Sequence, residues 1–79
     1  MKFDLKELRK RTRMPVITIF WNPKDLPNKY VARVFDLDRP TMLAAVADTL
    51  EDIRSCVPEG MVRFPRTEKD DPVVVESWM

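Results

Sequence analysis

The sequence predicts an α+β domain, in which an antiparallel sheet of four or five strands carries one main helix on one face. The expected order is β-β-β-α-β-β, preceded by a short basic helix. Three observations predict this fold. First, 79 residues suffice for only one small domain. Second, 44% hydrophobic and 34% charged residues are typical of a folded chain. Third, seven prolines and one glycine separate short β-branched and aromatic runs, and proline marks the edges of helices and strands. We expect one domain over residues 1–79, with a basic arm or helix at 1–13 and a core at 14–79.

The first 13 residues predict a short, basic, weakly amphipathic helix. Phe3, Leu5 and Leu8 supply its apolar side over Lys2–Thr12, and so few apolar turns give a helix of marginal stability by itself. This segment holds six basic and two acidic residues, whereas residues 41–60 hold one basic and four acidic. Such asymmetry suits either an anionic partner or a solvated helix that lies against the protein's own acidic surface.

Two extended runs follow Pro15. Val16–Trp21 is β-branched and aromatic and is too short for a helix, which predicts a strand. Asn22–Lys29 is rich in turn-forming residues, and Tyr30–Leu37 resumes the extended pattern. We expect the second run to pair antiparallel with the first.

The stretch from Pro40 to Pro58 supports two interpretations. Apolar residues recur there at steps of three and four, as in one long amphipathic helix: Leu43, Val46, Leu50, Ile53 and Val57. However, Asp48-Thr49-Leu50-Glu51 matches a capping box, which belongs at the start of a helix. We therefore favour a strand over Thr41–Ala47 and a helix over Thr49–Cys56, and the long helix from Pro40 is the alternative.

A second hairpin is expected at the C-terminal end. Pro58-Glu59-Gly60 ends the helix, because glycine suits a left-handed exit. Met61–Phe64 and Val73–Trp78 are extended runs separated by a polar turn that ends in Asp70-Asp71-Pro72. These runs complete the predicted sheet.

The middle of the chain resembles the core of HicB-type antitoxins. Tyr30–Leu37 is similar to the family's strand with a V-P-D-L-like end, and Asp48–Arg54 is similar to its D-T-L-E-E helix start. The resemblance covers residues 16–57. It implies a three-stranded antiparallel meander with one helix packed across it, and a task of binding and masking a small RNA-cleaving toxin. The sequence differs from the family at Ala47, where glycine is usual, and in lacking the family's proline-glycine pair.

Few residues suggest chemistry. The chain has no histidine, so the commonest general base and metal ligand are missing. Cys56 is the single cysteine and is expected to be a buried, inert thiol. The acidic pairs Asp36/Asp38 and Asp70/Asp71 lie in predicted turns, where aspartate bonds to the backbone. The sequence therefore predicts no catalytic residue, no metal site and no cofactor. Charged residues near the start and short apolar runs predict no secretory signal and no membrane helix, hence a cytoplasmic protein.

A binding surface is predicted on the sheet. Alternation along the second strand places Val31, Arg33, Phe35 and Leu37 on one face, and both faces of that strand are largely apolar. One short helix covers only part of one face, so the N-terminal helix, a partner or a second copy must cover the other. Because tryptophan and arginine often anchor interfaces, the predicted partner-binding residues are Trp21, Arg33, Phe35 and Trp78. The tryptophans serve equally well as plugs of the core.

The sequence thus predicts a non-catalytic protein-binding module with a protein partner or a homodimer. The alternative is nucleic-acid binding through the basic N-terminal residues Lys6, Arg9, Lys10, Arg11 and Arg13. A third reading is a domain without an activity of its own.

Overall fold

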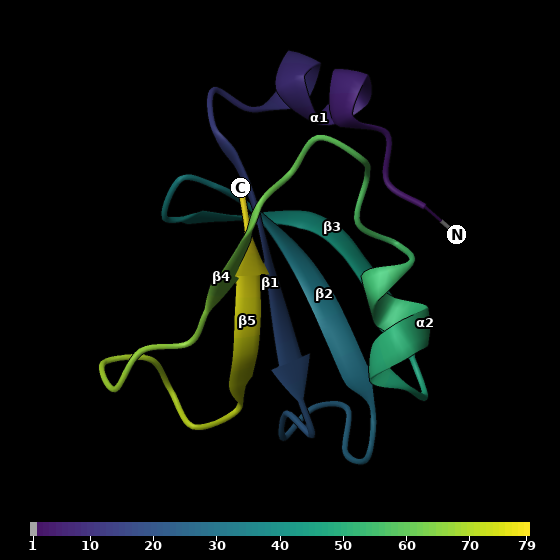
Figure 1. Ribbon diagram of the computed structural model, residues 1–79, viewed down its shortest axis with the longest axis vertical. Coiled ribbons are helices and arrows are strands. Elements are labelled where there is room, and N and C mark those ends of the chain that lie inside the picture. Colours follow the sequence, from purple (N-terminus) through teal and green to yellow (C-terminus); the bar gives the residue numbers. More distant parts are fainter. Residues whose placement is uncertain (1) are drawn as a thin grey trace.

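The computed structural model describes residues 2–79 and shows a five-stranded antiparallel sheet with two short helices (Figure 1). The predicted α+β class and element order are confirmed. The elements are α1 (Leu5–Arg11), β1 (Pro15–Trp21), β2 (Tyr30–Asp36), β3 (Arg39–Ala47), α2 (Leu50–Arg54), β4 (Arg63–Pro65) and β5 (Val74–Trp78). The strand order across the sheet is β3-β2-β1-β5-β4.

The contested segment after Pro40 is a strand, so the long helix from Pro40 is wrong. β3 pairs antiparallel with β2, with Val46 opposite Val31. In this arrangement Leu43, Ala45 and Ala47 pack against the core, which is a spacing of two and not of three or four. The steps of three and four that suggested a helix include Val46. Its side chain lies on the opposite face of the strand and is 49% exposed.

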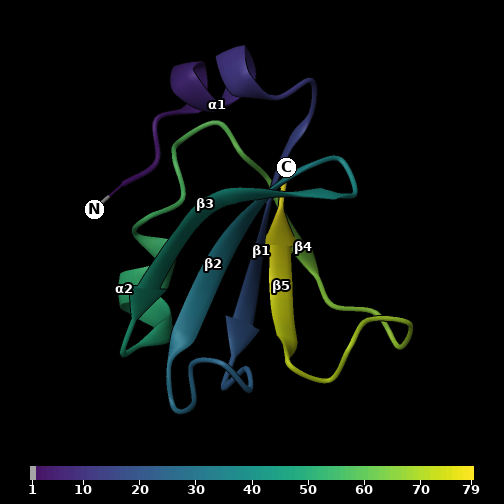
Figure 2. The same cartoon turned by 180° about the vertical axis from the view of Figure 1, so that it is seen from behind.

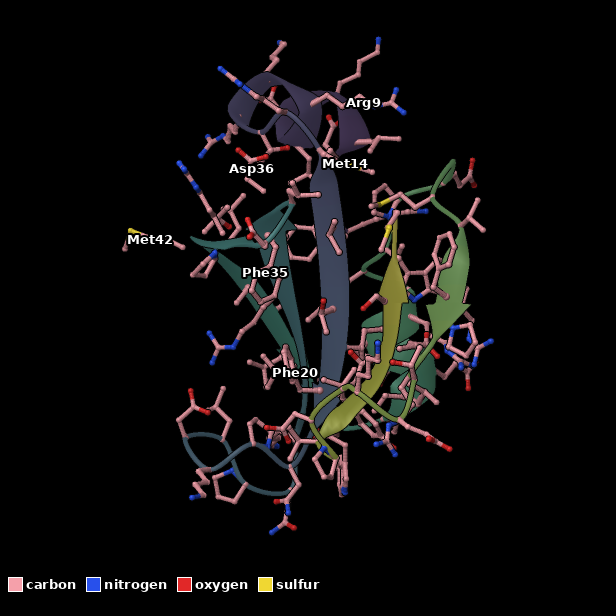
Figure 3. All side chains as sticks on the ribbon, turned by 90° about the vertical axis from the view of Figure 1, so that its left-hand side faces the viewer. Arg9, Met14, Phe20, Phe35, Asp36 and Met42 are labelled. Atoms are coloured by element: carbon pink, nitrogen blue, oxygen red, sulfur yellow. The ribbon has the colours of Figure 1, made fainter. Side chains whose placement is uncertain are left out.

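A bulge bends β3 near its start. The β2–β3 register shifts between Arg33 and Phe35. The Thr41 hydroxyl donates a 2.7 Å hydrogen bond to the Val34 carbonyl, and it accepts one of 3.2 Å from the Leu43 amide. Met42 projects fully into solvent at this bend, well away from the sheet (Figure 3). Such bulges disrupt an edge strand as a template for indiscriminate pairing.

α2 begins one residue later than the predicted capping box. The cap is Thr49, whose hydroxyl accepts a 3.1 Å hydrogen bond from the Asp52 amide. Asp48 instead forms an ion pair with Lys29, at the end of the β1–β2 loop. The helix is also shorter than expected, and Ile53 and Val57 are buried.

This assignment predicts that Thr49→Ala lowers the free energy of unfolding by about 1 kcal/mol, because an amide at the start of α2 loses its acceptor. Asp48→Ala removes only an exposed ion pair and should cost less than about 0.5 kcal/mol. Urea denaturation of the two variants checks this. Equal losses of unfolding free energy, or a larger loss for Asp48→Ala, would indicate that Asp48 is the N-cap of α2.

α1 closes one end of the core. Asp4 caps it by accepting a 2.9 Å hydrogen bond from the Lys6 amide. Leu8 is 2% exposed and packs in the same cluster as Phe3 and the α2 residue Ile53. Figure 1 shows α1 at one end of the strands. α1 therefore belongs to the helical side and does not cover the opposite sheet face.

The C-terminal hairpin is confirmed. β4 pairs antiparallel with β5, and β5 pairs with β1, so the hairpin extends the sheet on the side away from β3. A bulge in β5 accompanies a register shift between Ile19 and Phe20. β4 contains only three residues and ends in Pro65, which makes it a poor template for further pairing.

Candidate functional site: the open face of the sheet

The two faces of the sheet have different surroundings. α2 lies in front of the sheet in Figure 1 and behind it in Figure 2, where no helix crosses the face toward the viewer. The covered face contributes Ile17, Ile19, Ala32, Val34 and Ala45 to the main core. Both helices thus pack on the side of the covered face.

The opposite side, here called the open face, draws residues from all five strands. Strand register and alternation place on it Val16, Thr18, Phe20, Val31, Arg33, Phe35, Ala44, Val46, Phe64, Val74 and Ser77. One row across the sheet reads Val46, Val31, Phe20 and Val74. Only one of these side chains is charged.

Some side chains of the open face are buried and others are exposed to solvent. Val31 is fully buried and Val16 is 7% exposed, although no helix lies over them. Phe20 and Phe35 are half-buried and point to the same side of the sheet (Figure 3). Val46 and Phe64 remain 49% and 45% exposed. Apolar area is therefore left in contact with solvent at both edges of the face, on β3 and on β4.

The charge on the open face has a partner. The Arg33 guanidinium donates a 2.7 Å hydrogen bond to Asp25 of the β1–β2 loop. Arg33 lies between Thr18 on β1 and Ala44 on β3. The bridge ties the loop to this face and neutralises its charge, so an apolar partner would meet no unpaired ion there.

The predicted partner-binding residues separate into two groups. Arg33 and Phe35 lie together on the open face. Trp21 and Trp78 lie on the other side. The Trp21 ring contacts the Tyr30 ring at a tilt of 42°, with centroids 4.5 Å apart, and the Trp78 indole donates a 2.8 Å hydrogen bond to Glu76. Strand alternation could have shown this, since Ile17, Ile19 and Trp21 share one parity.

Glu76 forms a buried cluster that the sequence reasoning missed. Its side chain is 0% exposed and accepts four hydrogen bonds. Arg54 donates two, at 3.0 and 2.7 Å, and Arg63 and Trp78 donate one each, at 2.9 and 2.8 Å. Burial alone would raise the pKa of Glu76, but the hydrogen bonds from Arg54, Arg63 and Trp78 outweigh it and lower the pKa to about 2. The cluster joins α2, β4 and β5.

The charged N-terminal segment forms a second surface. The side chains of Lys6, Arg9, Lys10, Arg11 and Arg13 are all exposed. Among residues 2–79 the only ion pair that any of them makes is Lys10 with Glu7, at 3.5 Å. In the described part of the chain, this segment does not pair with the acidic residues of 41–60.

One acidic pair serves a turn, as expected: Asp70 accepts from the Thr67 amide and Asp71 from the Val73 amide. The turn prediction is wrong for Asp36, which ends β2 and accepts hydrogen bonds from the amides of Arg13 and Met14, at 3.0 and 3.2 Å, because it fixes the segment that enters β1. Within residues 2–79, no three histidine, cysteine or acidic side chains come together to hold a metal ion. Cys56 is buried, as expected. No helix within these residues combines the length and apolar character needed to cross a bilayer.

Comparisons with known proteins do not assign the chain to a family. No family model, no curated protein and no solved structure matches it. The open face and the basic surface are therefore the features that bear on function.

Proposed function

We propose that the chain is a non-catalytic protein-binding module that docks a partner on the open face. One observation carries the proposal: both helices pack on one side of the sheet, and the other side has no helix over it. That side presents half-buried phenylalanines on the inner strands β1 and β2, and exposed Val46 and Phe64 on the outer strands β3 and β4. Apolar side chains left exposed on one face of a small domain mark a candidate interaction site. Aromatic side chains such as those of Phe20 and Phe35 are enriched in protein interfaces.

The most specific version of the proposal is an antitoxin-like role. The β1-β2-β3 meander with α2 against it is the arrangement that the HicB-type resemblance implies. In this version the open face masks a small RNA-cleaving toxin. The test is whether the purified protein binds and inhibits a toxin encoded beside its gene. Absence of both binding and inhibition would contradict this version.

The variant Phe35→Asp tests the use of the open face. It should lower self-association or partner binding at least about a hundredfold, because it places a charge among the apolar side chains of the open face. Val46→Asp, at a more exposed position, should act in the same direction with less risk to folding. Sedimentation equilibrium measures self-association. Partner binding is measured as the amount of partner protein that the tagged chain retains from the source cells.

Glu51→Lys, at an exposed position of α2, is the control and should bind as the wild type does. Far-UV circular dichroism verifies that each variant is folded. The proposal fails if the wild type neither self-associates nor retains a specific protein. It also fails if the folded open-face variants bind as strongly as the wild type.

Nucleic-acid binding is the alternative function. The basic side chains of residues 6–13 are exposed, and most have no acidic partner in the described structure. Phosphate binding by such a surface falls steeply with salt. Filter binding at two salt concentrations, with Arg9, Lys10, Arg11 and Arg13 neutralised together, distinguishes the two functions. Salt-sensitive affinity that is lost in this variant would favour nucleic acid.

A further inference from the structure

A hollow of about 390 Å³ lies away from the open face, between α1, the start of β1 and the loop after α2. Its apolar lining includes Leu5, Met14 and Met61, and its basic lining comes from Arg9 and Arg13. Figure 3 shows Arg9 and Met14 at the α1 end of the molecule. The volume falls within the range of about 300–1,000 Å³ that is usual for small-molecule sites.

The two arginines are available to an anion. Both are exposed, and neither takes part in an ion pair among residues 2–79. The carboxylate of Asp36 is held near Arg13 by the amides of Arg13 and Met14. That carboxylate is oriented by the backbone and is not paired with either guanidinium.

The only glycine in the sequence lies in the wall of the hollow. Gly60 has φ 96°, a conformation that L side chains rarely adopt. A Cβ there would stand 3.3 Å from the Leu5 side chain, closer than most such contacts. The wall therefore depends on a residue without a side chain, which leaves room beside Leu5.

We propose that this hollow binds a small amphipathic anion, namely a carboxylate or phosphate monoester on a short apolar chain. Guanidinium groups match the planar oxygens of carboxylates and phosphates. Methionine side chains are flexible and adapt to apolar groups of irregular shape. A lining with both arginines and apolar side chains thus suits a ligand with both features. This site is separate from the open face and does not depend on the proposed function.

The test is a titration of the ¹⁵N-labelled full chain with hexanoate and with hexyl phosphate. Acetate, inorganic phosphate and hexanol supply the anionic or the apolar feature alone. We expect saturable amide shifts at Leu5, Met14 and Met61, with at least one amphipathic probe binding about tenfold more tightly than acetate, inorganic phosphate and hexanol. The tighter of the two amphipathic probes identifies the preferred headgroup.

Arg9→Gln and Arg13→Gln should each weaken that probe roughly tenfold, the loss expected for a charge-assisted hydrogen bond, and leave hexanol binding unchanged. Lys10→Gln removes the same charge from α1 outside the lining of the hollow and should have little effect. The proposal is overturned if neither amphipathic probe binds more tightly than hexanol. It is also overturned if Lys10→Gln weakens binding as much as Arg9→Gln.

Discussion

Replacing Glu76 by glutamine should lower the free energy of unfolding by about 2–3 kcal/mol at neutral pH. The wild-type carboxylate is fully buried and accepts hydrogen bonds from Arg54, Arg63 and Trp78. A neutral amide keeps the shape but loses the charge that these donors favour. The arginine side chains are 41% and 47% exposed, so solvent screens part of the loss. Urea denaturation at pH 7 measures it.

The same carboxylate makes stability depend on pH. The folded-state pKa of Glu76 is about 2, below its ordinary value of 4.5. A group with a lowered folded pKa contributes stability above its unfolded pKa and loses it as pH falls toward the folded pKa. The wild type should therefore lose stability between about pH 5 and pH 2, and Glu76→Gln should lose about 2–3 kcal/mol less over that range.

Glu51→Gln, an exposed carboxylate on α2, is the matched control and should follow the wild-type pH dependence closely. Two results would count against the Glu76 cluster as a major stabilising element. One is a loss for Glu76→Gln no larger than that of the control. The other is an unchanged acid slope in Glu76→Gln.

Leu8→Ala should destabilise the protein by about 2–4 kcal/mol, because the side chain is 2% exposed and its removal leaves a cavity in the core. The effect follows from the packing of α1 into the same core as Phe3 and Ile53. Thermal or urea unfolding measures the loss, and hydrogen exchange of the Thr12 amide, which bonds to the Leu8 carbonyl, reports on α1.

Lys10→Ala changes an exposed position of the same helix and should cost less than about 0.5 kcal/mol. If Leu8→Ala is equally mild, and the Thr12 amide exchanges freely in the wild type, α1 is a loosely attached arm. That outcome would contradict the packing of α1 in the core.

The strands could be predicted from sequence because proline bounds each β-branched run. The start of α2 could not be placed to the residue, since Asp48 and Thr49 are both good caps. In the folded chain Thr49 is the cap and Asp48 pairs with Lys29, which is distant in sequence. Likewise, the long-helix alternative for residues 40–57 could be rejected only once β2 supplied a pairing partner for β3.

The candidate site was predictable in part. Alternation on β2 correctly placed Arg33 and Phe35 on one face, because side chains alternate regardless of tertiary context. The role of Glu76 was not predictable, since its partners Arg54 and Arg63 come from separate elements and approach it only in the folded chain. A lone glutamate in the apolar run of β5 was the one available signal.

Site-specific photocrosslinking in the source cells tests the central claim most directly. A photoreactive benzoylphenylalanine replaces Val46 or Phe64 on the open face, and Glu51 on α2 serves as the control position. The account predicts a discrete adduct from the open-face positions, of a second copy or of one partner protein, and none from position 51. Absence of any adduct from positions 46 and 64, or the same adducts from all three positions, would contradict it.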